Sequence, residues 1–136
     1  MLDALDQAIL YPRFFLFVHF KEPDYSGHHY GQGSAGYLDA IIDCDVELGR
    51  LIDYLKSNGI YDDTLVYVVT DHGFNPGTNY HDDAPICFLA TNDSAIKRRG
   101  NLRDISLTIY HRLGIDTRGL QPIFKGRDLT EPECQW

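Results

Sequence analysis

The sequence has 136 residues, an apolar content of 43% and 20 acidic against 12 basic side chains, which give a formal net charge of −8. This length suits about one domain, and the acid excess argues against nucleic-acid binding, which requires basic surface to neutralise phosphates. The longest apolar run, around residues 14–20, is far too short to span a bilayer, so we expect no membrane segment.

The N-terminal residues MLDALDQ carry acids where a secretory signal would carry Lys or Arg, so the sequence predicts no export signal. Three widely separated cysteines, Cys44, Cys87 and Cys134, form no C-x-x-C pair. An odd number of cysteines suits reduced thiols better than a disulfide framework. We therefore expect a cytoplasmic protein.

The first predicted elements are a strand and a long helix. Residues 14–20, FFLFVHF, are aromatic and branched and lie between two prolines, a pattern that predicts a mostly buried strand. From Ser34 to Ser57, apolar residues recur at three- and four-residue steps, which is typical of an amphipathic helix. Ser34 is a suitable N-cap, and Asn58-Gly59 supplies the left-handed residue that ends such helices.

Two more strands and a second helix follow. TLVYVVT (64–70) is apolar or β-branched throughout, as expected for a strand covered on both faces of a parallel sheet. PICFLA (85–90) predicts a third strand, and LRDISLTIYHRL (102–113) predicts a helix that Gly114 stops. The tail from Asp116 is rich in Gly and Pro and is expected to be irregular.

The order of these elements indicates the fold class. Strand, helix and strand over residues 14–70 form a βαβ unit, whose crossover is right-handed. The sequence therefore predicts an α/β fold, with an open, mainly parallel sheet and helices on both of its faces. Residues 1–136 show no repeat, low-complexity linker or domain boundary, so we expect a single domain.

Potential metal ligands follow the first two predicted strands. Asp24 and His28 come after the first strand as D-x-x-x-H, Asp71 and His72 follow the second directly, and His81 precedes the third. Ligands bind beyond the carboxyl ends of parallel strands, because loops converge there. Oxygen and imidazole nitrogen together suit Zn²⁺ or Mn²⁺ better than Ca²⁺, so the pattern predicts a divalent metal centre.

Each of these residues also has a simpler interpretation, since a single His or Asp in a loop is usually solvated or forms a turn. Five of them at the ends of two buried strands are harder to explain in that way. His29 neighbours His28 and is a weaker candidate for contact with metal or substrate. Asp82 and Asp83 directly follow His81, and they either orient its ring or are simply exposed.

Several motifs together resemble the metal-binding half of the alkaline phosphatase superfamily. They are EPDYSGH (22–28), D-x-x-x-G-R-L-I (45–52), LVYVVTDHGF (65–74) and H-x-x-x-P (81–85). The likeness is closest to the type I phosphodiesterase/nucleotide pyrophosphatase branch and covers roughly residues 14–115, so the fold would be a truncated alkaline-phosphatase-like core.

The resemblance implies a site for two divalent metals, commonly zinc. Asp24, His28 and His81 match the protein ligands of one metal. Asp71 and His72 match two ligands of the other, which the family also binds through an upstream Asp and the nucleophilic Thr or Ser. The implied reaction is in-line displacement at the phosphorus of a phosphate ester, with one metal activating the nucleophile and the other steadying the leaving oxygen.

The sequence departs from the family pattern at its beginning. The nucleophile and its partner Asp normally lie in an N-terminal half, whereas only thirteen residues precede residue 14 here. We therefore assign no catalytic nucleophile in this chain and expect little or no turnover from it alone. Apolar surface and a strand edge left uncovered would favour self-association, for example into a homodimer.

Two other hypotheses stand beside a metal-dependent phosphohydrolase. The first is a non-catalytic metal-binding or interaction module that keeps the ligands as a remnant and pairs with a partner. The second is a flavodoxin-like sheet with fortuitous acids and histidines, which the adjacent Asp71 and His72 after a buried strand disfavour. The motifs leave open whether the substrate would be a phosphomonoester, a phosphodiester or a sulfate.

Overall fold

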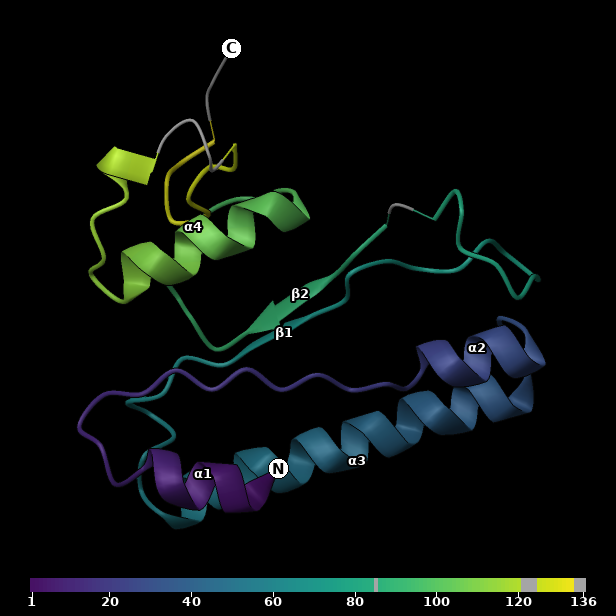
Figure 1. Cartoon of the computed structure of the whole chain (residues 1–136), viewed down its shortest axis with the longest axis horizontal. Coiled ribbons are helices and arrows are strands. Elements are labelled where there is room, and N and C mark those ends of the chain that lie inside the picture. The colour runs from purple at the N-terminus through teal and green to yellow at the C-terminus, as the bar shows by residue number, and fades with distance from the viewer. Residues whose placement is uncertain (85, 121–124, 134–136) are drawn as a thin grey trace. The chain divides into compact units, whose positions relative to one another are not determined.

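The computed structural model of the chain combines helices with a small sheet, as the predicted α/β class requires (Figure 1). It describes residues 1–84, 86–120 and 125–133. These residues belong to two compact units, Met1–Leu65 with His72–Ile86 and Val66–Asp71 with Cys87–Trp136. The expected single domain over residues 1–136 stays a prediction. No helix in the described ranges has the length and apolar character needed to cross a bilayer.

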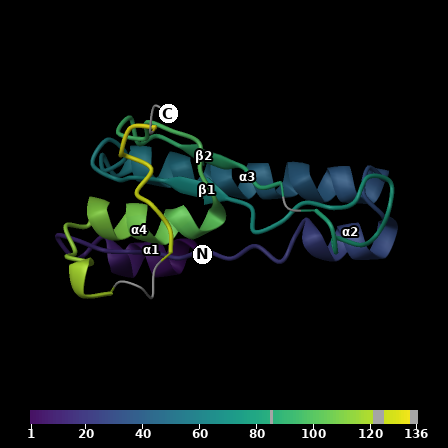
Figure 2. The same ribbon diagram turned by 90° about the horizontal axis from the view of Figure 1, so that it is seen from above.

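The first unit is built on one long helix, α3 (Ala35–Ser57), which has α2 (Asp24–Tyr30) at its N-terminal end (Figure 2). The shorter α1 (Leu2–Ala8) lies beside the C-terminal end of α3, where the Tyr54 hydroxyl donates a hydrogen bond to the Asp6 carboxylate. Leu5 of α1 and Leu55 of α3 are each 1% exposed and are the most deeply buried apolar side chains of this unit.

The predicted helix over residues 34–57 is confirmed. Ser34 is its N-cap, and its Oγ accepts a hydrogen bond from the Tyr37 backbone N–H at 3.2 Å. At the other end, Gly59 has a φ of +67°, the left-handed backbone that terminates a helix. The predicted apolar stripe is buried only in part, because Leu38 and Ile42 are 49% and 60% exposed.

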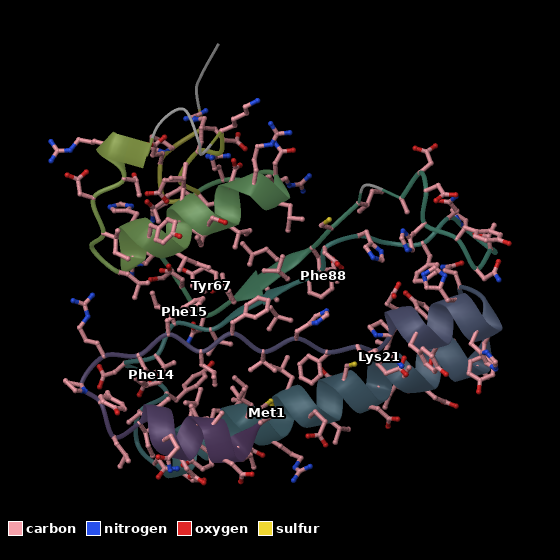
Figure 3. The ribbon with its side chains drawn as sticks, viewed as in Figure 1. Met1, Phe14, Phe15, Lys21, Tyr67 and Phe88 are labelled. Carbon is pink, nitrogen blue, oxygen red and sulfur yellow. The ribbon has the colours of Figure 1, made fainter. Side chains whose placement is uncertain are left out.

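The predicted strand at residues 14–20 is wrong. This segment forms neither helix nor strand, and Phe15 and Phe17 are 61% and 77% exposed. Burial alternates along it, with Phe14 and Phe15 on opposite sides of the backbone (Figure 3). The side-chain pattern of a strand is therefore present, but a strand also requires a neighbour for its backbone N–H and C=O groups.

The second unit contains the two strands that the structure describes. β1 (Tyr67–Val69) pairs with β2 (Leu89–Thr91) in antiparallel orientation, with Val68 opposite Ala90. Both lie within or beside the predicted strands at residues 64–70 and 85–90, although each is shorter and residue 85 lies outside the described residues.

The predicted βαβ unit over residues 14–70 is not formed, because residues 14–20 are not a strand that could pair in parallel with residues 64–70. β1 and β2 are not parallel neighbours either, since such neighbours need a crossover connection, usually a helix, and residues 72–84 contain none. The chain instead turns back on itself after β1 and returns in β2. An open, mainly parallel sheet with helices on both faces is therefore not found in residues 1–84, 86–120 and 125–133, where the sheet has two strands.

The predicted second helix is confirmed as α4 (Leu102–Arg112). A capping box begins it, in which the Asn101 side chain accepts from the backbone of Asp104 and the Asp104 carboxylate accepts from the Asn101 N–H at 2.9 Å. Gly114, with a φ of +72°, follows its end. In the tail, expected to be irregular, the described residues form one 3₁₀ turn at Arg118–Leu120.

Asp104 also joins α4 to the segments around it. Its carboxylate accepts the Arg127 backbone N–H at 2.8 Å and faces the Arg98 guanidinium at 3.1 Å. Burial alone raises the pKa of this carboxyl, but the hydrogen bonds from Asn101, Arg127 and Arg98 outweigh burial, so that its pKa is lowered. A second buried carboxylate, Asp93, similarly accepts from the Tyr67 hydroxyl of β1 and pairs with Arg112 of α4 at 2.9 Å (Tyr67 is labelled in Figure 3).

Replacing Asp104 with Asn is expected to destabilise the second unit by about 3–5 kcal/mol at pH 7, because the Arg98 side chain, 8% exposed, loses its counter-charge. Urea unfolding followed by far-ultraviolet circular dichroism measures the change. The lowered pKa means that the stabilising effect of Asp104 is present above its ordinary pKa of 3.8 and is lost as the pH falls through the folded value. The difference between wild type and variant should therefore shrink in acid.

The matched control is Asp116→Asn, which removes a carboxylate paired with Arg118 in a solvent-exposed ion pair. Exposed pairs contribute little to stability, so this variant should unfold at the wild-type urea midpoint. Equal midpoints for the Asp104 and Asp116 variants would contradict the structural role given to Asp104.

Candidate metal centre

Helix α2 (Asp24–Tyr30) carries the first two candidate ligands. The sequence pattern does not indicate this helix, and we expected Asp24 and His28 in a loop. In a helix, residues four apart lie on the same face, so the D-x-x-x-H spacing brings both side chains to one side of α2. The His28 Nε2 lies 3.5 Å from the Asp24 Oδ1.

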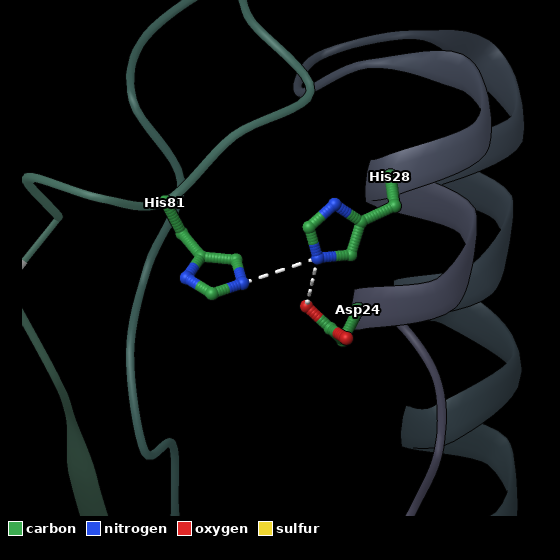
Figure 4. Close-up of side chains that lie close together, drawn as sticks. All are labelled: Asp24, His28 and His81. Atoms are coloured by element: carbon green, nitrogen blue, oxygen red, sulfur yellow. Dashed lines mark hydrogen bonds and ion pairs between the residues drawn. The ribbon is translucent and has the colours of Figure 1, made fainter.

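The segment that connects β1 to β2 supplies His81 to the same place (Figure 4). The His81 Nε2 lies 3.1 Å from the His28 Nε2, across 53 residues of sequence. One ligand atom each from Asp24, His28 and His81 lies within 4.8 Å of the others. The structure therefore brings together three of the five predicted ligands, all of them in the first unit.

One carboxylate oxygen in this cluster has no hydrogen-bond partner. The Asp24 side chain as a whole is 47% exposed, yet its Oδ1 is buried and accepts no hydrogen bond from any described residue. A buried carboxylate oxygen in that state is costly unless a cation neutralises it. This oxygen faces imidazole nitrogens, so a shared cation is the natural way to satisfy it.

A pair of hydrogen bonds between His28 and Asn79 determines which ring nitrogen His28 offers. The His28 Nδ1 lies 2.9 Å from the Asn79 carbonyl oxygen, and the Asn79 side-chain amide donates back to the His28 carbonyl at 3.3 Å. Because a carbonyl only accepts, Nδ1 carries the proton of the neutral ring and Nε2 is left with its lone pair. Metal-binding histidines are commonly oriented in this manner.

The distances also fit a small divalent ion. Tetrahedral zinc with bonds of about 2.0–2.1 Å keeps neighbouring ligand atoms roughly 3.3 Å apart. The observed separations of 3.1 Å between the two His nitrogens and 3.5 Å between His28 and Asp24 lie on either side of that value. Two imidazoles and one carboxylate form a donor set that suits zinc and manganese.

His72 lies beside this cluster. Its ring stacks on that of His81, with centroids 3.9 Å apart and planes 22° apart, and its Nε2 lies 3.8 Å from the Asp24 Oδ1. Its Nδ1 bonds to the Gly73 carbonyl at 3.0 Å. Asp71 belongs to the second unit, where its backbone carbonyl accepts a hydrogen bond from the Cys87 thiol at 3.1 Å. Ligation of a second ion by Asp71 and His72 stays a prediction.

The three weaker candidates have other surroundings. His29 is exposed and stacks on Tyr25, with ring centroids 6.4 Å apart, and it is not part of the cluster of Asp24, His28 and His81. Asp82 and Asp83 are both exposed, and the backbone N–H of Asp83 donates to the Asn75 side chain at 3.3 Å. Their roles toward His81 or a substrate remain predictions.

Other residues near the cluster were not singled out in the sequence. Phe74 contacts several of the imidazoles, and Asn79 anchors His28 through its backbone. Tyr37 of α3 lies close enough that burial first, and the negative charge of Asp24 second, raise the pKa of its hydroxyl. Phe74 stands in the DHGF motif and could have been found there, whereas an isolated Asn offers no such signal.

Comparison with known proteins shows the family to which the chain belongs. A family model for type I phosphodiesterase/nucleotide pyrophosphatase matches residues 1–118. The chain belongs to this family, as the sequence motifs indicated. No solved structure matched the chain significantly.

Similar curated proteins carry related names. A bis(5'-adenosyl)-triphosphatase of Xenopus laevis is 32% identical over 66 residues, which are 48% of this chain and 15% of that protein. Ectonucleotide pyrophosphatase/phosphodiesterase family member 1 of Homo sapiens is 33% identical over 67 residues, 49% of this chain and 7% of the relative. Venom phosphodiesterase 2 of Crotalus adamanteus is 34% identical over 59 residues, 43% and 7% respectively. The chain thus matches only a small part of the length of these relatives.

The loop that carries His81 is expected to loosen when Asn79 is replaced by Ala. The change removes the side-chain hydrogen bond to the His28 carbonyl, which contributes about 1 kcal/mol to stability. The loop should therefore open about five times as often. The readout is amide exchange at Gly77, because its N–H donates to the Gln32 side chain where the same loop meets the segment that follows α2. Hydrogen exchange followed by NMR measures the effect. Amides in the middle of α3 serve as the internal control, and unchanged exchange at Gly77 would refute an anchoring role of the Asn79 side chain, because the backbone bond from Asn79 to the His28 Nδ1 stays in place.

Proposed function

We propose that this chain is the metal-binding portion of a phosphodiesterase or pyrophosphatase that hydrolyses phosphate esters with divalent metal. The observation that carries the proposal is the buried Asp24 Oδ1, which has no hydrogen-bond partner and lies 3.5 Å from the His28 Nε2. Family membership supports the reaction class. Zinc suits the donor set best, with manganese as the second choice.

Asp24, His28 and His81 would hold one ion. Three protein ligands leave a fourth position for water or substrate, which is the arrangement of catalytic rather than structural zinc sites. The exposure of His28 and Asp24, 44% and 47%, gives a phosphate ester access to that position. When bound, the metal would act as a Lewis acid toward a phosphoryl oxygen or activate a bound nucleophile.

The residues of this chain then have defined tasks. The Asn79 backbone carbonyl keeps the proton of the neutral His28 ring on Nδ1, so that Nε2 has the lone pair that a metal ligand needs. Asp24 contributes the negative charge that partly neutralises the ion. Asp71 and His72 are proposed as two ligands of a second ion, which would stabilise the opposite oxygen of an in-line displacement.

The nucleophile is proposed to come from a polypeptide segment other than these 136 residues. Two observations support this part of the proposal. The matched region is only 7–15% of the length of the relatives quoted above, and large apolar side chains that a completing segment could cover are exposed, among them Phe15, Phe17, Ile42 and Val46. Without an activated hydroxyl, turnover should fall by several powers of ten.

The metal site is tested by zinc binding. The purified chain should bind about one equivalent of Zn²⁺ tightly, as measured by competition with a chromophoric chelator, and zinc should raise its melting temperature. Asp24→Ala and His28→Ala should each abolish both effects, because only two ligands then remain at the site. His29→Ala is the matched control, since His29 neighbours His28 yet stacks on Tyr25 outside the cluster, and it should bind zinc as the wild type does.

No zinc above background in the wild type, together with unchanged melting temperatures of the Asp24 and His28 variants, would rule out the metal site. Equal loss of zinc in the His29 variant would show that the effect is not specific to the cluster.

Hydrolysis of bis-p-nitrophenyl phosphate tests the activity. The zinc-loaded chain alone should release p-nitrophenolate at a rate near that of the protein-free control. Addition of a polypeptide that carries the Thr or Ser nucleophile segment of the family should raise the rate by several powers of ten. The alternative function is a non-catalytic metal-binding or interaction module, which predicts binding of the two chains without any gain in rate.

A further inference from the structure

We propose that Phe74 is a positioning residue that sets the directions of the metal-binding imidazoles, and that Gly27 is required in α2 because only glycine leaves room for the Phe74 ring. The inference rests on the proposed metal site of Asp24, His28 and His81. It adds two residues to that site which do not themselves touch the metal.

The Phe74 ring is in contact with three imidazoles at once. Its centroid lies 5.3 Å from that of His28, 5.6 Å from that of His81 and 6.2 Å from that of His72. The interplanar angles are 71°, 88° and 71°, which is the edge-to-face geometry that aromatic rings prefer. Each contact restricts rotation of an imidazole about its own side-chain bonds.

Phe74 also contacts a fourth aromatic ring. The ring of Tyr37, on α3, lies 5.6 Å from that of Phe74 at an interplanar angle of 71°. Phe74 is therefore held from α3 while it contacts His28 on α2 and His81 on the loop. A displacement of Phe74 would therefore change the ring orientation of ligands from two separate segments of the chain.

Gly27 explains how the ring can approach α2 so closely. A Cβ atom at position 27 would lie 2.5 Å from the Phe74 Cζ and 2.6 Å from its Cε2, closer than carbon atoms can pack. Gly27 has no positive φ, so its backbone does not call for glycine. Glycine inside a helix costs about 1 kcal/mol of stability relative to alanine. At position 27 the close approach of the Phe74 ring explains why glycine is present despite this cost.

The orientation of the His28 and His81 rings matters for metal binding. Their Nε2 atoms lie 3.1 Å apart, and both lone pairs must point to one position, between these atoms and Asp24, where the ion would bind. Hydrogen bonding fixes the proton on His28 but leaves a range of ring tilts. Edge-to-face packing against Phe74 narrows that range for both rings. Residues of this kind change metal affinity by about 10–100-fold when they are replaced.

A double-mutant cycle in zinc affinity tests the inference. Gly27→Ala should weaken zinc binding by about 10–100-fold, because its methyl group displaces the Phe74 ring. Phe74→Leu should weaken zinc binding to a similar extent. In the Phe74→Leu background, Gly27→Ala should change the zinc affinity by less than about twofold, since the clash no longer exists.

The chain offers a matched control at Gly49, which lies in α3 where an added Cβ would meet nothing within 4 Å. Gly49→Ala should leave zinc affinity at the wild-type value. The visible spectrum of the Co²⁺-loaded protein provides a second readout, because it reports ligand geometry, and it should change in Gly27→Ala but not in Gly49→Ala. Circular dichroism checks that each variant is folded.

Equal effects of Gly27→Ala in both backgrounds, or wild-type affinity in Phe74→Leu, would overturn the inference. A metal-free measurement separates this result from failure of the proposed function. Nuclear Overhauser contacts from the Phe74 ring to the His28 and His81 rings should be present in the wild type and lost in Gly27→Ala. If these contacts persist in Gly27→Ala, the packing argument is wrong. If they are lost in Gly27→Ala but the wild-type protein binds no zinc, the packing argument holds and only the metal site is wrong.

Discussion

The reciprocal hydrogen bonds between His28 and Asn79 join the two segments from which the candidate site is built. One segment is a helix of seven residues, and the other is a loop without regular structure. Neither could hold an imidazole in place by itself, since short helices are marginal and loops are mobile without anchors. Joined through Asn79, they place two ring nitrogens and a carboxylate oxygen at separations suited to one divalent ion.

Electrostatics and packing make different contributions to this site. The unpartnered Asp24 oxygen supplies a reason for a cation to bind, and the tautomer of His28 leaves a lone pair available for it. Phe74 contributes no charge, but it packs edge-to-face against the imidazoles, and we propose that this packing limits their movement. The affinity of such a site for a metal ion depends on the donor atoms themselves. It also depends on how rigidly the side chains are held, because ligands with few alternative conformations lose less entropy when the metal binds.

The two long helices could be predicted from the sequence because each has both a periodic apolar pattern and clear end signals, Ser34 and Gly59 for α3 and Asn101 and Gly114 for α4. The grouping of Asp24, His28 and His81 was also predictable, although for a partly mistaken reason. We expected parallel strands to bring the loop of Asp24 and His28 to the edge of a sheet, whereas a turn of helix α2 places these two side chains together. The loop before β2 then returns His81 to them.

The remaining differences have local causes. Helix α2 has seven residues, which is too few for a 3.6-residue period to be visible. Residues 14–20 alternate in burial as a strand would, and side-chain patterning cannot report whether a hydrogen-bonding neighbour exists. The antiparallel pairing of β1 and β2 is consistent with the short connection between them, which contains no crossover helix.

The two compact units are interleaved along the chain, because the stretch Val66–Asp71 of the second unit interrupts the first. No single cut in the polypeptide can therefore separate them, and the shortest contiguous peptide that contains both Asp24 and His81 also includes β1. The ligands meet only after a long loop has closed, at an entropic cost that rises with the logarithm of loop length. An ion that bound all three would act as a staple across that loop and would link metal uptake to folding.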